Sequence, residues 1–133
     1  MIDPKLNGPD PSQGDLFAPW PAWSPDSPAG KFELFHASNP IVFETLVKEA
    51  RRWMAEGRGK LGISLLIGRV RWVLSLKLQR DGDGFRINDH YGPFYSRLLM
   101  YTYPEFEGLF ETRRSYDADQ WIADRARAGR QAA

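Results

Sequence analysis

Hydrophobic side chains recur at three- and four-residue steps after Pro40, which is the spacing of an amphipathic helix. They are Phe43, Leu46, Val47, Ala50, Trp53 and Met54. Asn39 is expected to cap this helix, with Pro40 at the first helical position, where a missing N–H is tolerated. Gly57 is expected to end it. The pattern therefore predicts a helix between these two boundaries.

A second apolar pattern follows, and its end is ambiguous. Lys60–Ile63 is too short for a helix and predicts a brief strand, after which Ser64 is expected to cap a helix. The helix is indicated by Leu66, Ile67, Val70, Val73 and Leu74. Leu74, Leu76 and Leu78 then alternate with polar residues, which is the period of a strand. The sequence leaves open where the helix ends.

A third helix, rich in aromatic residues, is predicted beyond a turn at Asp81–Gly84. Asn88 or Asp89 is expected to cap it, Pro93 is tolerated only in its first turn, and Pro104 ends it. Its apolar positions are Tyr91, Phe94, Tyr95, Leu98, Leu99 and Tyr101.

Shorter elements are expected around these helices. Residues 31–37 predict a short helical turn, and residues 85–87 a short strand. Residues 109–113 alternate like a strand after Gly108. Residues 117–127 predict a last helix, because acidic residues come early and arginines late, as the helix dipole prefers.

The order of these elements predicts a mainly α fold with a small antiparallel β-sheet (α+β), in the form of a winged-helix-like three-helix domain over residues 31–116. Residues 1–30 form a leader, and residues 117–133 a C-terminal helix or tail. In winged-helix domains the third helix enters the major groove of DNA. Two details depart from the standard version. About eleven residues separate the second and third helices instead of three or four, and Arg97 is the one arginine or lysine of the third helix.

The leader holds seven of the ten prolines within residues 1–28 and is expected to be disordered. Within it, Gln13, Asp15, Leu16 and Phe17 resemble the Gln-x-(Asp/Ser)-Leu-Phe peptide by which bacterial replication and repair proteins dock into the sliding clamp. Adjacent large apolar side chains in such a segment are available to the pocket of another protein. The alternative is that Leu16, Phe17 and the tryptophans of the leader fold back onto the body.

Charge is distributed unevenly, although the net charge is only +1. Residues 1–30 hold one lysine against four aspartates (−3), residues 31–80 ten basic against four acidic groups (+6), and residues 81–133 seven against nine (−2). A basic patch of this kind can bind phosphate backbone, and a solvated helix face explains it equally well. The candidate DNA-binding residues are Arg51, Arg52, Arg58, Lys60, Arg69, Arg71, Arg113 and Arg114.

No catalytic or metal-binding motif is present in the sequence. The chain has no cysteine, which excludes disulfides, thiolate zinc sites and a cysteine nucleophile. His36 and His90 are its two histidines and have no zinc-ligand spacing. Asp81 and Asp83 resemble the start of a calcium loop, but Arg86 replaces the required glycine. We therefore expect no enzyme, no metal, no cofactor and no small-molecule substrate.

The hydropathy of the chain bears on its location. The leader lacks the basic start and apolar stretch of a signal peptide, and no apolar run approaches the length of a membrane span. A soluble protein in the cytoplasm of a bacterial host cell, without a membrane partner, is the expectation.

The body of the chain resembles a family of short phage and prophage proteins. The resemblance rests on Phe32, Phe35-His36, Asn39-Pro40, Lys60-Leu61-Gly62-Ile63, Val70-Arg71-Trp72, Phe85, Asn88, Tyr95-Ser96-Arg97-Leu98 and Phe110-Glu111-Thr112-Arg113. Members of that family often carry a leader with a Gln-x-x-Leu-Phe-like peptide. The resemblance implies a bacterial or phage origin and a setting near DNA metabolism, and it supplies no catalytic residue.

These features predict a non-enzymatic accessory protein of DNA replication or repair that binds the bacterial sliding clamp through its leader. The basic residues of the body are candidates for contacting the phosphate backbone of double-stranded DNA, and the alternative is that the body binds a second protein. Two alternatives remain: a winged-helix DNA-binding regulator, and a protein-binding adaptor or inhibitor of phage origin that uses the aromatic third helix as an interface.

Overall fold

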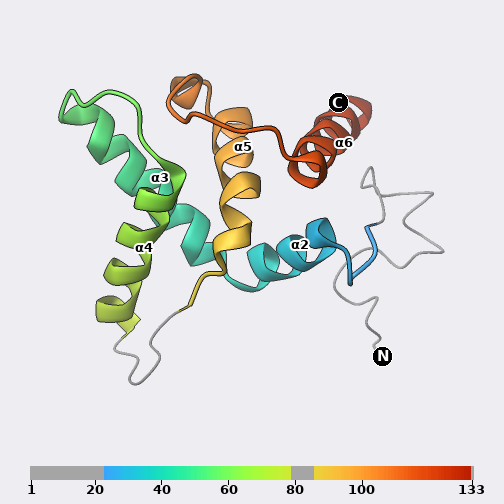
Figure 1. Ribbon diagram of the computed structural model, residues 1–133, viewed down its shortest axis with the longest axis horizontal. Coiled ribbons are helices and arrows are strands. Elements are labelled where there is room, and N and C mark those ends of the chain that lie inside the picture. Colours follow the sequence, from blue (N-terminus) through green and yellow to red (C-terminus); the bar gives the residue numbers. More distant parts are fainter. Residues whose placement is uncertain (1–22, 79–85, 133) are drawn as a thin grey trace.

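The computed structural model describes residues 23–78 and 86–132, and this part of the chain is built from helices (Figure 1). The α-helices are α2 (Pro28–Ser38), α3 (Pro40–Ala55), α4 (Ile63–Leu78), α5 (Gly92–Thr102) and α6 (Tyr116–Ala132). Two short 3-10 helices, η2 (Asp89–Tyr91) and η3 (Pro104–Phe106), flank α5. The described residues contain no strand, so the predicted antiparallel sheet and the winged-helix-like architecture are wrong. The mainly α class is confirmed.

The segments expected to pair as strands do lie side by side, but they form no ladder. The Leu61 N–H donates to the Leu109 carbonyl at 2.9 Å, and the Lys60 ammonium donates to the Gly108 carbonyl at 3.2 Å. Leu109 and Phe110 are both buried, whereas a strand would point them to opposite faces. The connection before α6 is therefore an irregular segment held by consecutive apolar residues.

Helix α4 runs to Leu78, past the point where alternation predicted a strand. Leu74 is fully buried, while Leu76 is 61% exposed, and both fit one continuous helix. The helix starts at Ile63 without Ser64 as its cap, and the Leu66 N–H donates to the Gly62 carbonyl at 3.1 Å. The turn predicted at 81–84, and Phe85 after it, lie outside the described residues.

The boundaries between α2 and α3 are partly as expected. Pro40 occupies the first turn of α3, and Gly57, with a φ of 74°, follows its end, as predicted. Asn39 does not cap α3 with its side chain; its Nδ2 donates to the Phe35 carbonyl at 2.9 Å and so closes α2. Helix α2 is longer than predicted because the Ser27 hydroxyl accepts the Gly30 N–H and caps it four residues before Lys31.

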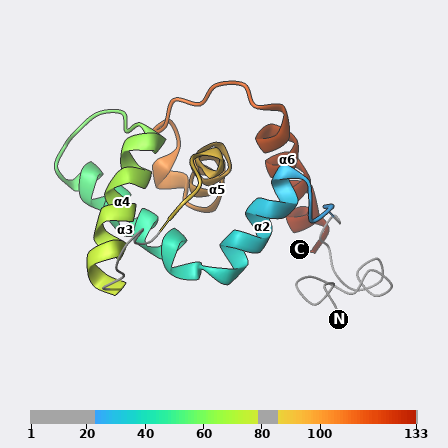
Figure 2. The same ribbon diagram turned by 60° about the horizontal axis from the view of Figure 1, so that its bottom comes forward.

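Helix α5 occupies the centre of the body (Figure 1). Helices α3 and α4 lie on one side of it, and α2 and α6 on the other, an arrangement also visible in the turned view (Figure 2). Its residues are buried without interruption from Phe94 to Leu99. A helix buried on all sides is a core helix, so the predicted third helix has no face with which to read a DNA groove.

The ring of Phe32 in α2 is the centre of the aromatic core. It lies 5.0 Å from the Phe94 ring and 4.8 Å from the Tyr95 ring of α5, and 5.1 Å from the Trp121 ring of α6. Phe32, Tyr95 and Trp121 are fully buried. Helix α6 therefore belongs to the core and is no detached tail.

Candidate functional site

The clamp-like peptide at Gln13–Phe17 lies outside the described residues, which begin at Trp23. Trp23 packs on Trp121, with ring centroids 6.3 Å apart, beside α2 and α6. Trp23 belongs to the leader of residues 1–30, so its packing on Trp121 is what the fold-back alternative expected of this tryptophan.

Three of the eight predicted DNA-binding residues are held in ion pairs within the body. Arg51 pairs with Glu105 at 3.0 Å, Arg69 with Glu49 at 3.2 Å, and Arg71 with Asp89 at 3.0 Å. Arg71 also donates to the Ile87 carbonyl at 2.9 Å. Each of these arginines links two helices through its carboxylate partner. The paired carboxylate reduces the positive potential that the arginine presents to a phosphate backbone.

The other five have different surroundings. Arg52 is exposed on α3, and the Arg58 guanidinium lies 4.9 Å above the Trp53 ring. The Lys60 ammonium donates a hydrogen bond to the Gly108 carbonyl. Arg113 and Arg114 belong to the irregular segment before α6, at a distance in the chain from the others. Of the eight predicted residues, Arg52, Arg58 and Arg69 line one groove, and DNA binding by the whole set stays a prediction.

A groove of roughly 400 Å³ lies between the end of α3 and the start of α4. It is lined by Glu49, Arg52, Trp53, Glu56, Arg58, Leu61, Leu65, Leu66 and Arg69. Two carboxylates stand among three arginines, so the groove is a mixed surface instead of a basic track. Such a composition suits a protein partner better than a phosphate chain.

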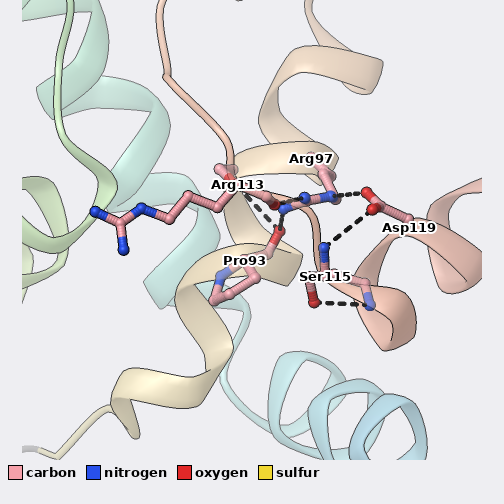
Figure 3. Close-up of polar contacts among 7 residues, drawn as sticks. Pro93, Arg97, Arg113, Ser115 and Asp119 are labelled. Atoms are coloured by element: carbon pink, nitrogen blue, oxygen red, sulfur yellow. Dashed lines mark hydrogen bonds and ion pairs between the residues drawn. The ribbon is translucent and has the colours of Figure 1, made fainter.

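Arg97, the one arginine of α5, is a structural residue (Figure 3). Its guanidinium is buried and donates to Asp119 at 2.6 Å, to the Pro93 carbonyl at 2.9 Å and to the Arg113 carbonyl at 2.7 Å. The hydrogen bond from Arg97, followed by one from the Ser115 N–H, lowers the pKa of the Asp119 carboxyl. The side chain of Arg113 points away from this cluster. Arg97 therefore joins α5, the connecting segment and α6.

Sequence reasoning missed an apolar stripe on the outer face of α4. Leu65, Trp72 and Leu76 are 60%, 57% and 61% exposed, although they are large hydrophobic residues. Their spacing places them on one helix face together with Arg69, whose guanidinium lies 5.1 Å from the Trp72 ring. The sequence left open whether the helix continues past Leu74, so this face was not identified. A helix continued to Leu78 would have revealed it.

No group of three metal-binding side chains occurs among the described residues. His36 and Tyr95 are the polar residues of the aromatic core, and neither lines the groove. The His36 ring lies 5.7 Å from the Phe32 ring and 5.9 Å from the Tyr95 ring. The His36 Nδ1 and the Tyr95 hydroxyl are buried, with no hydrogen-bond partner in the described part of the chain. Burial raises the pKa of Tyr95 and, together with Arg125, lowers that of His36 to about 4.

The partly buried His36 predicts that stability falls as the pH decreases from 6.5 to 4. The unfolded chain binds a proton near its ordinary pKa of 6.5, whereas the folded chain binds it only near 4. Because part of the imidazole is open to solvent, screening reduces the effect, and each pH unit in this window lowers the free energy of unfolding by well under about 1.4 kcal/mol. Urea denaturation at a series of pH values measures it. His36→Phe should flatten this slope and His90→Ala should keep it; an unchanged slope in His36→Phe would reject the assignment.

Comparison with protein-family models, with curated proteins and with solved structures found no match. The resemblance to short phage and prophage proteins therefore stays a prediction. No helix in the described ranges is both long enough and apolar enough to cross a membrane.

Proposed function

We propose that this protein is a non-enzymatic accessory protein of bacterial DNA replication or repair that binds the sliding clamp through its leader. The observation that carries the proposal is the sequence Gln13-Gly14-Asp15-Leu16-Phe17. Leu16 and Phe17 would enter an apolar pocket of the clamp, and the Gln13 amide would donate and accept hydrogen bonds at its rim. Asp15 adds a charge or a local turn-forming acceptor.

The described end of the leader does not decide between clamp binding and fold-back. Trp121 is packed by Phe32 and Phe94 of the body and by Trp23 of the leader, so this leader tryptophan does pack onto the body. The proposal therefore rests on the residues Gln13–Phe17 themselves, which lie outside the described part of the chain.

The expected affinity for the clamp is modest. Burying Leu16 and Phe17 contributes roughly 1.5–3 kcal/mol each, and ordering the peptide backbone offsets much of it. A dissociation constant on the order of micromolar follows. In this proposal the body makes at most weak contacts with DNA backbone, through exposed arginines such as Arg52 and Arg114, because the central helix cannot read bases.

A double variant tests the clamp assignment. Leu16→Ala with Phe17→Ala should abolish co-purification with a purified bacterial sliding clamp, because both anchors of the peptide are lost. Leu6→Ala, in the same leader, should bind as the unchanged chain does. Isothermal titration and thermal melting of all three chains provide the measurement.

Two results would reject the proposal. One is clamp binding that survives in the double variant. The other is a large loss of thermal stability in that variant, which would mean that Leu16 and Phe17 pack onto the body. A synthetic peptide covering residues 11–19 should compete with the full chain for the clamp, and failure to compete would also count against it.

A further inference from the structure

Helix α4 is apolar on two faces, and one of them lacks a covering element among the described residues. Leu66, Ile67, Val70 and Leu74 form its buried face. The outer stripe of Leu65, Trp72 and Leu76 remains more than half exposed. Helix α4 lies at the edge of the body in both views (Figure 1, Figure 2). Arg69 lies within this row, and a row of large exposed apolar side chains beside one charge is a candidate binding surface for another protein.

The stripe has the shape of a helix-packing surface. Gly68 lies beside it on the helix, and a Cβ added at Gly68 would meet no atom within 4 Å. Small residues such as Gly68 and Ser75, next to large ones, let a second helix approach closely. The alternating four- and three-residue steps from Leu65 through Arg69 and Trp72 to Leu76 are those of a coiled-coil seam.

The order of residues in the stripe is self-complementary. Its steps of four, three and four residues read the same in both directions, with a leucine at each end. Two antiparallel copies with a twofold axis between Arg69 and Trp72 place each Leu65 opposite the other chain's Leu76. The same operation places each Arg69 opposite the other chain's Trp72. A twofold interface requires a surface that matches itself in this way.

We propose that this protein forms a homodimer in which α4 packs antiparallel against α4 of a second copy. The central charges permit this pairing. Each Arg69 is already neutralised by Glu49 at 3.2 Å and lies 5.1 Å from the Trp72 ring, so the two arginines near the axis repel each other little. Arg69 can stack on the tryptophan of either copy. Arg71 points to another side of the helix, where Ile87 and Asp89 bind it.

The expected dimer is weak and concentration-dependent. One helix stripe is smaller than the roughly 800 Å² per partner of a standard interface, and the neighbouring groove with Arg52, Trp53 and Arg58 adds a polar rim. The carboxylates of Glu49 and Glu56 in that groove favour a protein occupant over a nucleic acid.

Dimerisation through α4 does not depend on clamp binding. If both hold, the dimer presents two leader peptides, which increases avidity for any partner with two pockets.

Sedimentation equilibrium of the full chain over a hundredfold range of concentration tests the dimer. The mass should rise from one chain toward two, and Leu76→Asp should weaken association at least tenfold by placing a charge in the seam. Tyr116→Asp, at a residue that is 80% exposed outside α4, should leave the association unchanged. Circular dichroism checks that each variant is folded. A chain that stays monomeric throughout, or a Leu76→Asp variant that associates normally, overturns the proposal.

Cross-linking tests the antiparallel register without relying on loss of binding. The chain has no cysteine, so Leu65→Cys and Leu76→Cys can be made in separate chains. Oxidation of the mixture should give a covalent dimer of the two variants. Either variant alone should give little, because its own two sulfurs would be 11 residues apart along the pair, about 16 Å. Efficient cross-linking of either variant with itself would reject the antiparallel register. Binding of an oligonucleotide to the stripe in place of a second copy would reject the homodimer.

Discussion

Replacing Trp121 by alanine is expected to lower the free energy of unfolding by about 3–5 kcal/mol. The indole is fully buried and contacts rings from two other segments, Phe32 of α2 and Phe94 of α5. Its Nε1 also donates to the Glu33 carboxylate at 2.7 Å, and Arg125 lies over its face. Small domains are stable by only about 5–15 kcal/mol, so the variant should melt at least about 12 °C lower or fail to fold.

Two variants separate the contributions of Trp121. Trp121→Phe keeps the ring packing and removes the N–H donor, while Glu33 keeps its ion pair with Arg125 at 2.9 Å, so the expected loss is only about 1–2 kcal/mol. Trp72→Ala makes the same truncation at a residue that is 57% exposed and should change stability little at concentrations where the chain is monomeric. Equal losses in Trp72→Ala and Trp121→Ala would contradict the assignment of α6 to the core.

Local signals in the sequence predicted the ends of a helix well where the boundary residue can adopt only one role. Pro40 and Gly57 bracket α3 as expected, because proline fits the first helical turn and glycine adopts a φ of 74° after the last. Asn39 shows the limit of such signals. An asparagine between two helices can serve either one, and tertiary context assigns its amide to the end of α2.

The errors in the fold share one physical cause, which is that short apolar runs do not distinguish a helix from a strand. Leu74, Leu76 and Leu78 alternate, yet they continue α4, because one face of this helix is buried and the other remains open. Leu109 and Phe110 were expected to alternate in a strand and are instead both buried in an irregular segment. The predicted sheet depended on the short runs at residues 60–63 and 109–113, and neither forms a strand.

The sequence located the basic region of the chain, but it could not show which arginines are paired in the folded protein. Charge counts located the basic half of the chain, but they could not show that Arg51, Arg69 and Arg71 pair with carboxylates from other segments, since those partners are 18 to 54 residues away. The third helix was correctly found to be rich in aromatic residues and poor in basic ones. Its central position explains both properties, because a helix surrounded by others needs apolar side chains on every face.

Arg97→Met is expected to lower the free energy of unfolding by about 2–4 kcal/mol, since hydrogen bonds to charged groups contribute about 1.5–3 kcal/mol each and are not additive. The substitution removes donors to Asp119 of α6 and to the Arg113 carbonyl of the connecting segment (Figure 3). The side chain of Asp119 is about half exposed, so water can hydrate the released carboxylate and limit the loss. Chemical denaturation with the helical signal of circular dichroism measures the effect.

Geometry, more than charge, should determine which residue can replace Arg97. Arg97→Lys keeps the charge, but an ammonium cannot reach three acceptors in the plane of a guanidinium, so it should recover less than half of the lost stability. Arg51→Met removes a comparable arginine–carboxylate pair, to Glu105, in which both side chains are nearly half exposed, and should leave the melting temperature almost unchanged. A fully stable Arg97→Lys variant would show that charge alone suffices. A loss in Arg51→Met as large as in Arg97→Met would show that burial of the pair is not what makes Arg97 important.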